Sequence, residues 1–233
     1  MSDDDEVEAP LLDVLGASRE YGDVVALAPI DFRVERGECL AVVGPNGSGK
    51  STLLRLMAGR EIPTAGRVLF AGRPVDENGP EVREKMAVVA GASAFYPDLT
   101  TREHLEFVAL GHGSDDVGHV VDDALAWARL TEHADKFPAV LSAGQQQSLR
   151  LAGVLVRPRE LVILDEPEAH LDPAARGRLA ELLRAETDRG VAIVLATHQI
   201  EVARIAADRA LVLRDGFAGH LSRDDLASFE GEL

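Results

Sequence analysis

The stretch "CLAVVGPNGSGKSTLLRLMAG" at residues 39–59 decides the fold of this 233-residue chain. Its first five residues are apolar, as in a buried strand, and apolar residues recur at helical spacing after Lys50. Between them lies a glycine-rich turn that fits the pattern G-x-x-x-x-G-K-[ST]. A strand, such a turn and a helix in this order predict a loop whose backbone amides bind phosphate groups, helped by the dipole of the helix N-terminus.

The residue types within the turn predict individual roles. Lys50 would reach the β- and γ-phosphates of a nucleotide, and Ser51 would ligate Mg²⁺. Only three of the 24 basic residues are lysines, and a compact ammonium fits such a cradle better than a planar guanidinium. A chance match is the alternative, and the flanking strand and helix argue against it. The predicted binding residues are Gly44, Pro45, Asn46, Gly47, Ser48, Gly49, Lys50, Ser51 and Thr52.

Composition excludes several classes of protein. Hydrophobic residues make up 46% of the chain, yet no apolar run approaches the roughly 20 residues that a membrane-spanning helix needs. The N-terminus "MSDDDEVEAP" lacks the basic and apolar regions of a secretory signal, so we expect residues 1–10 to form a disordered acidic tail. A net charge of -16 disfavours a phosphate-backbone partner, so no nucleic acid is expected. The single Cys39 excludes an intrachain disulfide and is expected to be buried.

Periodicity predicts an α/β domain over residues 11–233, with a helical part inserted at about 95–156. Within that part, Thr100 and Glu103 form a predicted capping box. Strands are expected around 11–17, 30–35, 38–43, 67–70, 86–90, 161–165 and 191–196, helices at 50–58, 173–190 and 199–207, and a hairpin at 211–221.

Two buried strands end in residues that suit phosphate chemistry. "LVILDEP" at 161–167 ends in two acids, of which Asp165 would hold the Mg²⁺ shell and Glu166 would polarise the water that attacks the γ-phosphate. "VAIVLATHQ" at 191–199 contains His198, which could hydrogen-bond a γ-phosphate. Two structural alternatives remain open: the adjacent carboxylates could cap the next turn, and a lone histidine at a strand end could be structural.

Together these motifs resemble those of the ATP-binding cassette (ABC) family over residues of about 11 to 220. "GPNGSGKST" looks like the Walker A motif, "LVILDE" like Walker B, "LSAGQ" at 141–145 like the signature motif, "AHLD" at 169–172 like the D-loop and "ATHQ" at 196–199 like the switch histidine. Tyr21 matches the aromatic residue that stacks on adenine, with a buried core tyrosine as the alternative. The resemblance implies a P-loop NTPase fold of ABC type: a RecA-like α/β core, an antiparallel β-subdomain and an inserted α-helical subdomain.

In this family two nucleotide-binding domains dimerise head to tail, and each ATP lies between one Walker A motif and the partner's signature motif. The resemblance therefore implies that Ser142, Ala143, Gly144 and Gln145 serve the ATP of a second nucleotide-binding subunit. It also implies ATP and Mg²⁺ as ligands, and ATP hydrolysis that uses Lys50, Glu166 and His198. Integral membrane permease subunits would be the partners, with this chain peripheral on the cytoplasmic face of the cell membrane and export slightly favoured over import.

The sequence departs from the family pattern at a few positions. Gly91 stands where glutamine is usual, and that glutamine normally touches Mg²⁺ and the attacking water beside the groove that receives the membrane subunit. Ala143 replaces the first glycine of the signature motif, and Ser148 and Gly153 stand where arginines are common. Two alternatives to a transporter subunit therefore stay open: a soluble ABC-type ATPase, and a nucleotide-sensing module that hydrolyses ATP slowly.

Overall fold

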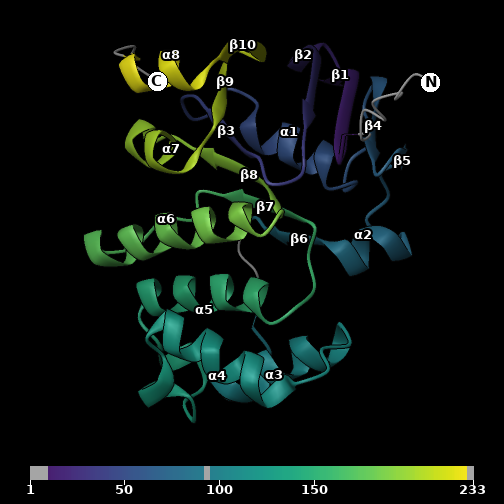
Figure 1. Cartoon of the computed structure of the whole chain (residues 1–233). Coiled ribbons are helices and arrows are strands. Elements are labelled where there is room, and N and C mark those ends of the chain that lie inside the picture. The colour runs from purple at the N-terminus through teal and green to yellow at the C-terminus, as the bar shows by residue number, and fades with distance from the viewer. Residues whose placement is uncertain (1–9, 92–94, 230–233) are drawn as a thin grey trace, which may run out of the picture.

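The computed structural model describes residues 10–91 and 95–229, and Figure 1 shows two sheets with helices around and below them. The predicted acidic tail falls on residues 1–9, outside the described residues, apart from Pro10. No helix in the described ranges is both long enough and apolar enough to cross a membrane.

The larger sheet has six strands in the order β10-β9-β3-β8-β7-β6. Its strands are β3 (Cys39–Val43), β6 (Met86–Val89), β7 (Leu161–Asp165), β8 (Ala192–Thr197), β9 (Arg209–Arg214) and β10 (Phe217–Leu221). All neighbours pair in parallel except β9 and β10, which form the predicted antiparallel hairpin. Parallel strands bring their carboxyl ends to one edge, and the register pairs Val43 with Thr197 and Asp165 with Ala196. The segments that follow β3, β7 and β8 therefore emerge side by side.

A second, antiparallel sheet has the strand order β2-β1-β4-β5. Its strands are β1 (Leu12–Tyr21), β2 (Val24–Val34), β4 (Ala65–Phe70) and β5 (Arg73–Pro74). The structure starts β2 well before the predicted residue 30, because its first residues pair with the end of β1 in a hairpin whose tip is exposed. Apolar alternation, on which the prediction relied, begins only where the strand turns one face to the core.

Helices cover the larger sheet and form the lower part of the molecule in Figure 1. They are α1 (Lys50–Met57), α2 (Pro80–Lys85), α3 (Thr101–Gly111), α4 (Val117–Ala128), α5 (Ala143–Leu155), α6 (Pro173–Asp188), α7 (Ile200–Ala206) and α8 (Arg223–Ser228), with 3-10 turns at Thr131–His133 and Pro138–Val140. The predicted capping box is confirmed: the Thr100 hydroxyl accepts from the amide of Glu103, whose carboxylate accepts from the Thr100 amide. Short α2 and α8 were not predicted, since six residues give too little periodicity.

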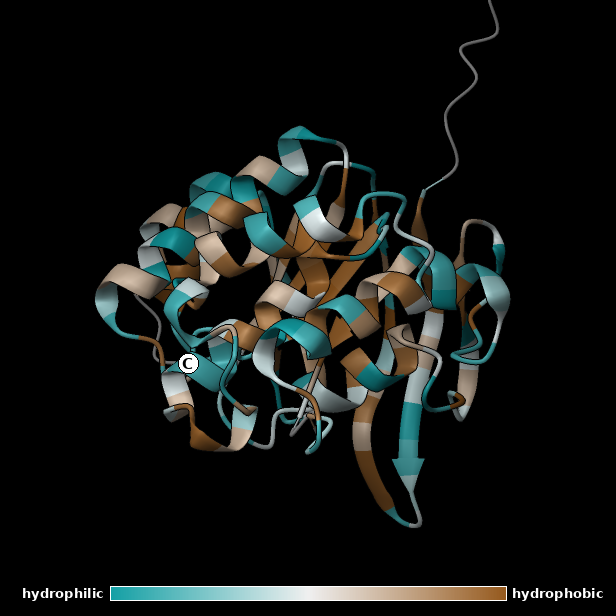
Figure 2. Ribbon diagram, turned by 90° about the horizontal axis from the view of Figure 1, so that it is seen from below, coloured by the Kyte–Doolittle hydropathy of each residue, from teal (hydrophilic) through white to brown (hydrophobic). Residues whose placement is uncertain are grey.

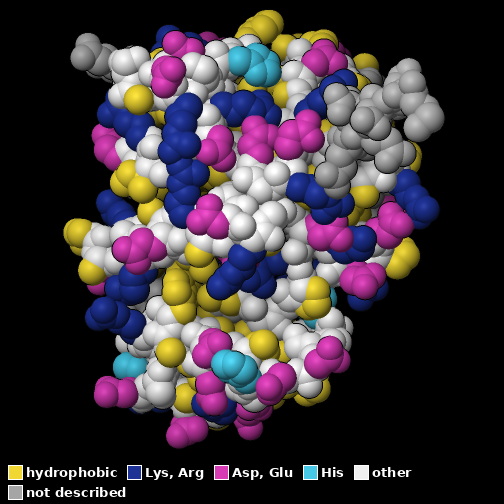
Figure 3. All heavy atoms as spheres, viewed as in Figure 1, with side chains coloured by type: hydrophobic (Ala, Val, Ile, Leu, Met, Phe, Trp, Pro, Cys, Tyr) yellow, Lys and Arg dark blue, Asp and Glu magenta, His cyan; other side chains and the backbone are white. Residues whose placement is uncertain are grey.

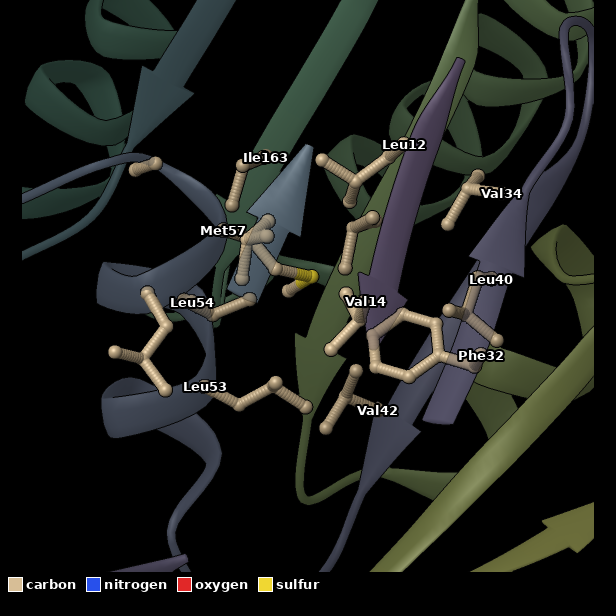
Figure 4. Packing of buried hydrophobic residues seen from close by; sticks show 14 of the residues in the cluster. Leu12, Val14, Phe32, Val34, Leu40, Val42, Leu53, Leu54, Met57 and Ile163 are labelled. Atoms are coloured by element: carbon tan, nitrogen blue, oxygen red, sulfur yellow. The ribbon is translucent and has the colours of Figure 1, made fainter. Parts of the chain in front are cut away.

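The main core lies between α1 and the two sheets. Leu53, Leu54 and Met57 point from α1 toward Leu12 and Val14 of β1 (Figure 4). Figure 2 shows the same pattern over the molecule, with hydrophobic strands inside and hydrophilic outer helix faces. A second core covers the other face of the large sheet beneath α6 and α7, and a third joins α3, α4 and α5. Cys39 is fully buried, as predicted.

Candidate nucleotide site

The loop at 44–49 joins β3 directly to α1. Gly49 has φ of 105°, and a Cβ there would lie 2.6 Å from the carbonyl oxygen of Ala26, so only glycine fits this position. The helix begins at the next residue, so its first amides point into the loop rather than to acceptors of their own helix. Local glycine chemistry thus gives the strand–turn–helix geometry for which the sequence predicts anion binding.

Lys50 is 5% exposed, and its ammonium donates to the carbonyl oxygens of Gly44 at 2.8 Å and Pro45 at 3.0 Å. Burial lowers the pKa of Lys50, against the carboxylates of Glu166, Asp165 and Glu168, which raise it. The carbonyl groups of Gly44 and Pro45 therefore hold the Lys50 ammonium against the start of the glycine-rich turn. An anion entering the loop would meet a positive charge that is already in place.

Asp165 and Glu166 lie at the end of β7, close to α1. The Ser51 hydroxyl donates to Asp165 Oδ2 at 3.1 Å, and Glu166 Oε1 lies 3.0 Å from His198 Nδ1. Burial raises the pKa of Asp165 and outweighs the hydrogen bond from Ser51, which lowers it. Glu166 has φ of 46°, a left-handed conformation that is unfavourable for a side-chain-bearing residue. The two carboxylates therefore contact Ser51 and His198 across the site, and not the turn that follows β7.

Ser51 and Asp165 fit a magnesium ion. Their hydroxyl and carboxylate oxygens form the hard donor set that Mg²⁺ prefers, and Mg²⁺ needs few protein ligands when substrate phosphates and water complete its octahedron. Across residues 10–91 and 95–229 no group of three or more histidine, cysteine or acidic side chains could hold a metal by itself. The geometry therefore suits an ion that arrives with a phosphate ligand.

Two cavities meet at Ser51 and Glu166. The first cavity, of about 440 Å³, is lined on one side by the phosphate loop and the start of α1: Asn46, Gly47, Gly49, Lys50, Ser51 and Thr52. The second, of about 450 Å³, lies on the other side of the carboxylates and includes Gly91. Gly44, Pro45 and Ser48 do not line either cavity, although the carbonyls of Gly44 and Pro45 hold Lys50.

The far wall of the first cavity was not predicted. Val24, Val25 and Ala26 of β2 line it together with Asp215 and Gly216 of the β9–β10 turn. The Ala28 amide donates to the Gly216 carbonyl at 2.8 Å, and the Gly216 amide donates to the Ser48 carbonyl at 3.1 Å. The turn thus ties β2 to the phosphate loop. "RDG" at 214–216 signals a turn, but nothing local in it indicates a ligand.

Tyr21 lies at the end of β1 and is 42% exposed, so the alternative of a buried core tyrosine is wrong. Its hydroxyl hydrogen-bonds to Glu61, and the Arg19 guanidinium lies 4.7 Å from its ring centroid. Tyr21 is not among the residues that line the first cavity, whereas Val24 and Val25 of the same hairpin are. The structure therefore fixes the ring at the hairpin and leaves part of it open to solvent.

The segment at 141–145 forms the start of α5. Ser142 is the N-cap: its hydroxyl accepts from the Gln145 amide at 3.3 Å, and Gln145 Oε1 accepts from the Ser142 amide at 2.9 Å. Ala143 is exposed, so its extra methyl group meets no neighbour in the interior. A Cβ at Gly144 would lie 2.8 Å from the His170 carbonyl oxygen, so glycine is required there. None of these four residues lines the cavities around Lys50 and Glu166.

Glu168 is a buried residue near the site that the sequence did not single out. It is fully buried, the Thr197 hydroxyl hydrogen-bonds to Oε1, and Oε2 has no partner in the described part of the chain. Burial raises the pKa of Glu168, more than the hydrogen bond from Thr197 lowers it. Since Thr197 precedes His198, this carboxyl group supports the end of β8.

Comparisons with known proteins agree with this geometry. The family model described as "ABC transporter" matches residues 27–169. The Nod factor export ATP-binding protein I of Bradyrhizobium diazoefficiens is 36% identical over 207 residues, 88% of this chain and 68% of that protein. The SkfA peptide export ATP-binding protein SkfE of Bacillus subtilis is 36% identical over 208 residues, 88% of this chain and 86% of that protein.

A solved dimeric structure of a bacterial ABC transporter cassette superposes with a TM-score of 0.83 at 25% sequence identity, covering 91% of this chain and 98% of that one. Most of the chain is matched, and its α/β fold with the phosphate loop is the predicted P-loop architecture. The chain therefore belongs to the ABC transporter family and carries its ATPase domain.

Proposed function

We propose that this chain binds and hydrolyses ATP as a subunit of an ABC transporter and powers transport through separate membrane permease subunits. The observation that carries the proposal is the contact of 3.1 Å between Ser51 and Asp165, beside Lys50 and Glu166. It joins the phosphate loop to the acidic strand end, so a nucleotide, a cation and a base would share one place. The two relatives described above are both named as export proteins, which favours export.

Each residue of the site has a part in the proposed reaction. Mg²⁺ held by Ser51 and Asp165 would neutralise charge on the β- and γ-phosphates. Lys50 binds the same oxygens, and Glu166 accepts the proton of the water that attacks the γ-phosphorus as ADP leaves. His198, 3.0 Å from Glu166, orients that carboxylate and can hydrogen-bond the γ-phosphate. The products are ADP and inorganic phosphate.

We propose that a second copy of this chain completes the site. Ser142 and the first-turn amides of Ala143 and Gly144 form a helix N-terminus that lines neither cavity of their own chain. Each copy carries both a phosphate loop and a signature segment, so two copies suffice for two complete sites. The dimeric cassette to which the chain is similar supports this arrangement. ATP would then join the two copies, and hydrolysis would release them.

The proposed permease contact is an exposed apolar patch that we call the α3 patch: Tyr96, Phe107 and Leu110. These side chains are 49%, 51% and 66% exposed, and the ring centroids of Tyr96 and Phe107 are 4.8 Å apart. Phe107 and Leu110 lie three residues apart and so share one face of α3. Charged side chains are interspersed over the face seen in Figure 3, with acidic ones gathered at its lower edge near α3 and α4. An apolar group of this kind is typical of an interaction surface.

Membrane association tests the transporter role. We expect the wild-type chain to sediment with membranes of its source cells in the presence of ATP, and to cross-link there to a polytopic protein. Phe107→Ser should abolish both, because it removes the centre of the α3 patch. Ile205→Ser, an equally drastic change at a 60% exposed position on α7, is the matched control and should bind as wild type. A wild-type chain that hydrolyses ATP but never associates with membranes would instead be a soluble ATPase.

Replacement of Tyr21 tests its proposed stacking on adenine. Tyr21→Ala should raise KM for ATP by about tenfold, since base–aromatic stacking contributes roughly 1–3 kcal/mol. Tyr21→Phe keeps the ring and should restore KM to near wild type, although it loses the bond to Glu61. Steady-state kinetics with ATP and with inorganic triphosphate separate the roles, because triphosphate has no base to stack. An unchanged KM in Tyr21→Ala would remove Tyr21 from the binding site.

A further inference from the structure

Arg150 of α5 lines the second cavity, which also contains Ser51, Asp165, Glu166 and Gly91. Among the side chains that line this cavity it is the one permanent cation, facing two carboxylates. It forms no ion pair with either of them in the described part of the chain, so the cavity separates the guanidinium from the acids. Position 91 contributes no side chain to this space.

One edge of Arg150 is linked to the loop that carries Glu166. Arg150 Nη1 donates to Gln147 Oε1 at 3.1 Å, and Gln147 Nε2 donates to the carbonyl oxygen of Pro167 at 3.0 Å. Gln147 is 6% exposed, so water competes little for these bonds. Pro167 directly follows Glu166, so these two hydrogen bonds link Arg150 to the backbone one residue from the carboxylate.

The guanidinium of Arg150 also contacts a different segment. Its guanidinium carbon lies 5.1 Å from the ring centroid of Phe95, a cation–π contact. Phe95 in turn packs edge-on against His104 of α3, with ring centroids 5.3 Å apart. Tyr96, the next residue, belongs to the α3 patch. The same guanidinium therefore contacts the segment that leads to the α3 patch and, through Gln147, the catalytic loop.

One hydrogen-bond donor of the Arg150 side chain, Nε, is buried and unsatisfied in the described residues. A buried donor without an acceptor costs free energy, so the contacts with Gln147 and Phe95 must impose the position of the side chain.

We propose that Arg150 is a positioning residue for Glu166, which keeps the loop at 165–167 in register with the segment at 95–96. A partner bound to the α3 patch would displace Phe95. Arg150 and Gln147 then transmit this displacement to Pro167, which changes the orientation of the Glu166 carboxylate. The inference rests on the proposed function, in which Glu166 is the base of ATP hydrolysis.

A double-mutant cycle on the full chain tests this, with steady-state ATP hydrolysis as the readout. Arg150→Met keeps a flexible apolar side chain but removes the guanidinium, and with it the hydrogen bond to Gln147 and the cation–π contact with Phe95, so it should lower kcat about tenfold while KM for ATP stays within about twofold. Phe95→Leu should lower kcat about threefold. Since both changes break one connection, the double variant should be no slower than Arg150→Met alone.

Two further variants control for folding. Arg157 is another half-buried arginine whose Nε has no partner in the described residues. It lies outside the second cavity and donates hydrogen bonds to the carbonyl oxygens of Arg83 and Met86. Arg157→Met should therefore change the melting temperature but not kcat. Arg150→Lys, which retains the charge, should have an intermediate kcat and serves if Arg150→Met does not fold. Multiplicative effects of Arg150→Met and Phe95→Leu, or wild-type kcat in the Arg150 variants, would overturn the inference. A wild-type chain without any hydrolysis would overturn the proposed function and this inference with it.

Discussion

Replacing Glu166 by glutamine is expected to lower kcat for ATP hydrolysis by at least about 100-fold, the usual contribution of a positioned general base. The amide cannot accept the proton of the attacking water, yet it keeps the shape of the carboxylate and can still pair with His198. ATP binding depends instead on Lys50 and the loop at 44–52 and should persist. Glu166→Gln should therefore bind ATP and remain in the ATP-bound dimer, because the step that would separate the copies is blocked.

Hydrolysis under single-turnover conditions and ATP affinity, measured on the same preparation, check this result. Glu168→Gln is the matched control, since it makes the same change two residues away in a fully buried side chain. Burial raises the pKa of Glu168, which shifts this carboxyl group toward the neutral form that glutamine mimics. Its kcat should stay within about threefold of wild type. A Glu166→Gln variant that turns over within twofold of wild type would contradict the role of Glu166.

The parts of the site that local chemistry dictates could be predicted from the sequence. The turn at 44–49 needs glycine at position 49 because a side chain there would clash with the Ala26 carbonyl oxygen. The spacing of the glycines in the sequence therefore already indicates the turn. Asp165 ends one buried strand and His198 directly follows another, and both strands are recognisable as apolar runs. Their proximity follows from parallel pairing, which sets the ends of neighbouring strands at one edge.

The parts that depend on distant segments could not be predicted. Val24 and Asp215 meet in one cavity because two hairpins far apart in sequence pack together, and neither hairpin carries a phosphate-binding pattern. Arg150 was missed for the same reason: its partners are Gln147, one turn away, and Phe95, which tertiary packing brings close. The departure at Gly91 was visible in the sequence, but the cavity around it was not.

A negative charge at Ser142 should have the second large effect on hydrolysis. Ser142→Asp keeps a good N-cap for α5, so the helix itself should be preserved. The new carboxylate would face the γ-phosphate of the partner copy, and repulsion between like charges should lower ATPase activity by about 100-fold. Ser222→Asp makes the same change at the N-cap of α8, away from both cavities, and should leave activity unchanged. Wild-type turnover by Ser142→Asp would contradict a role for the signature segment.

Mixing two inactive variants tests most directly whether the site is shared between copies. Lys50→Met spoils the phosphate loop and Ser142→Asp spoils the signature segment, so homodimers of either variant contain no intact site. A mixed dimer pairs the intact loop of one chain with the intact signature of the other. In an equimolar mixture about half of the dimers would be mixed, each with one of two sites intact, so activity should recover to about a quarter of wild type. ATPase activity that stays at the average of the two separate variants would contradict a site built from two copies of this chain.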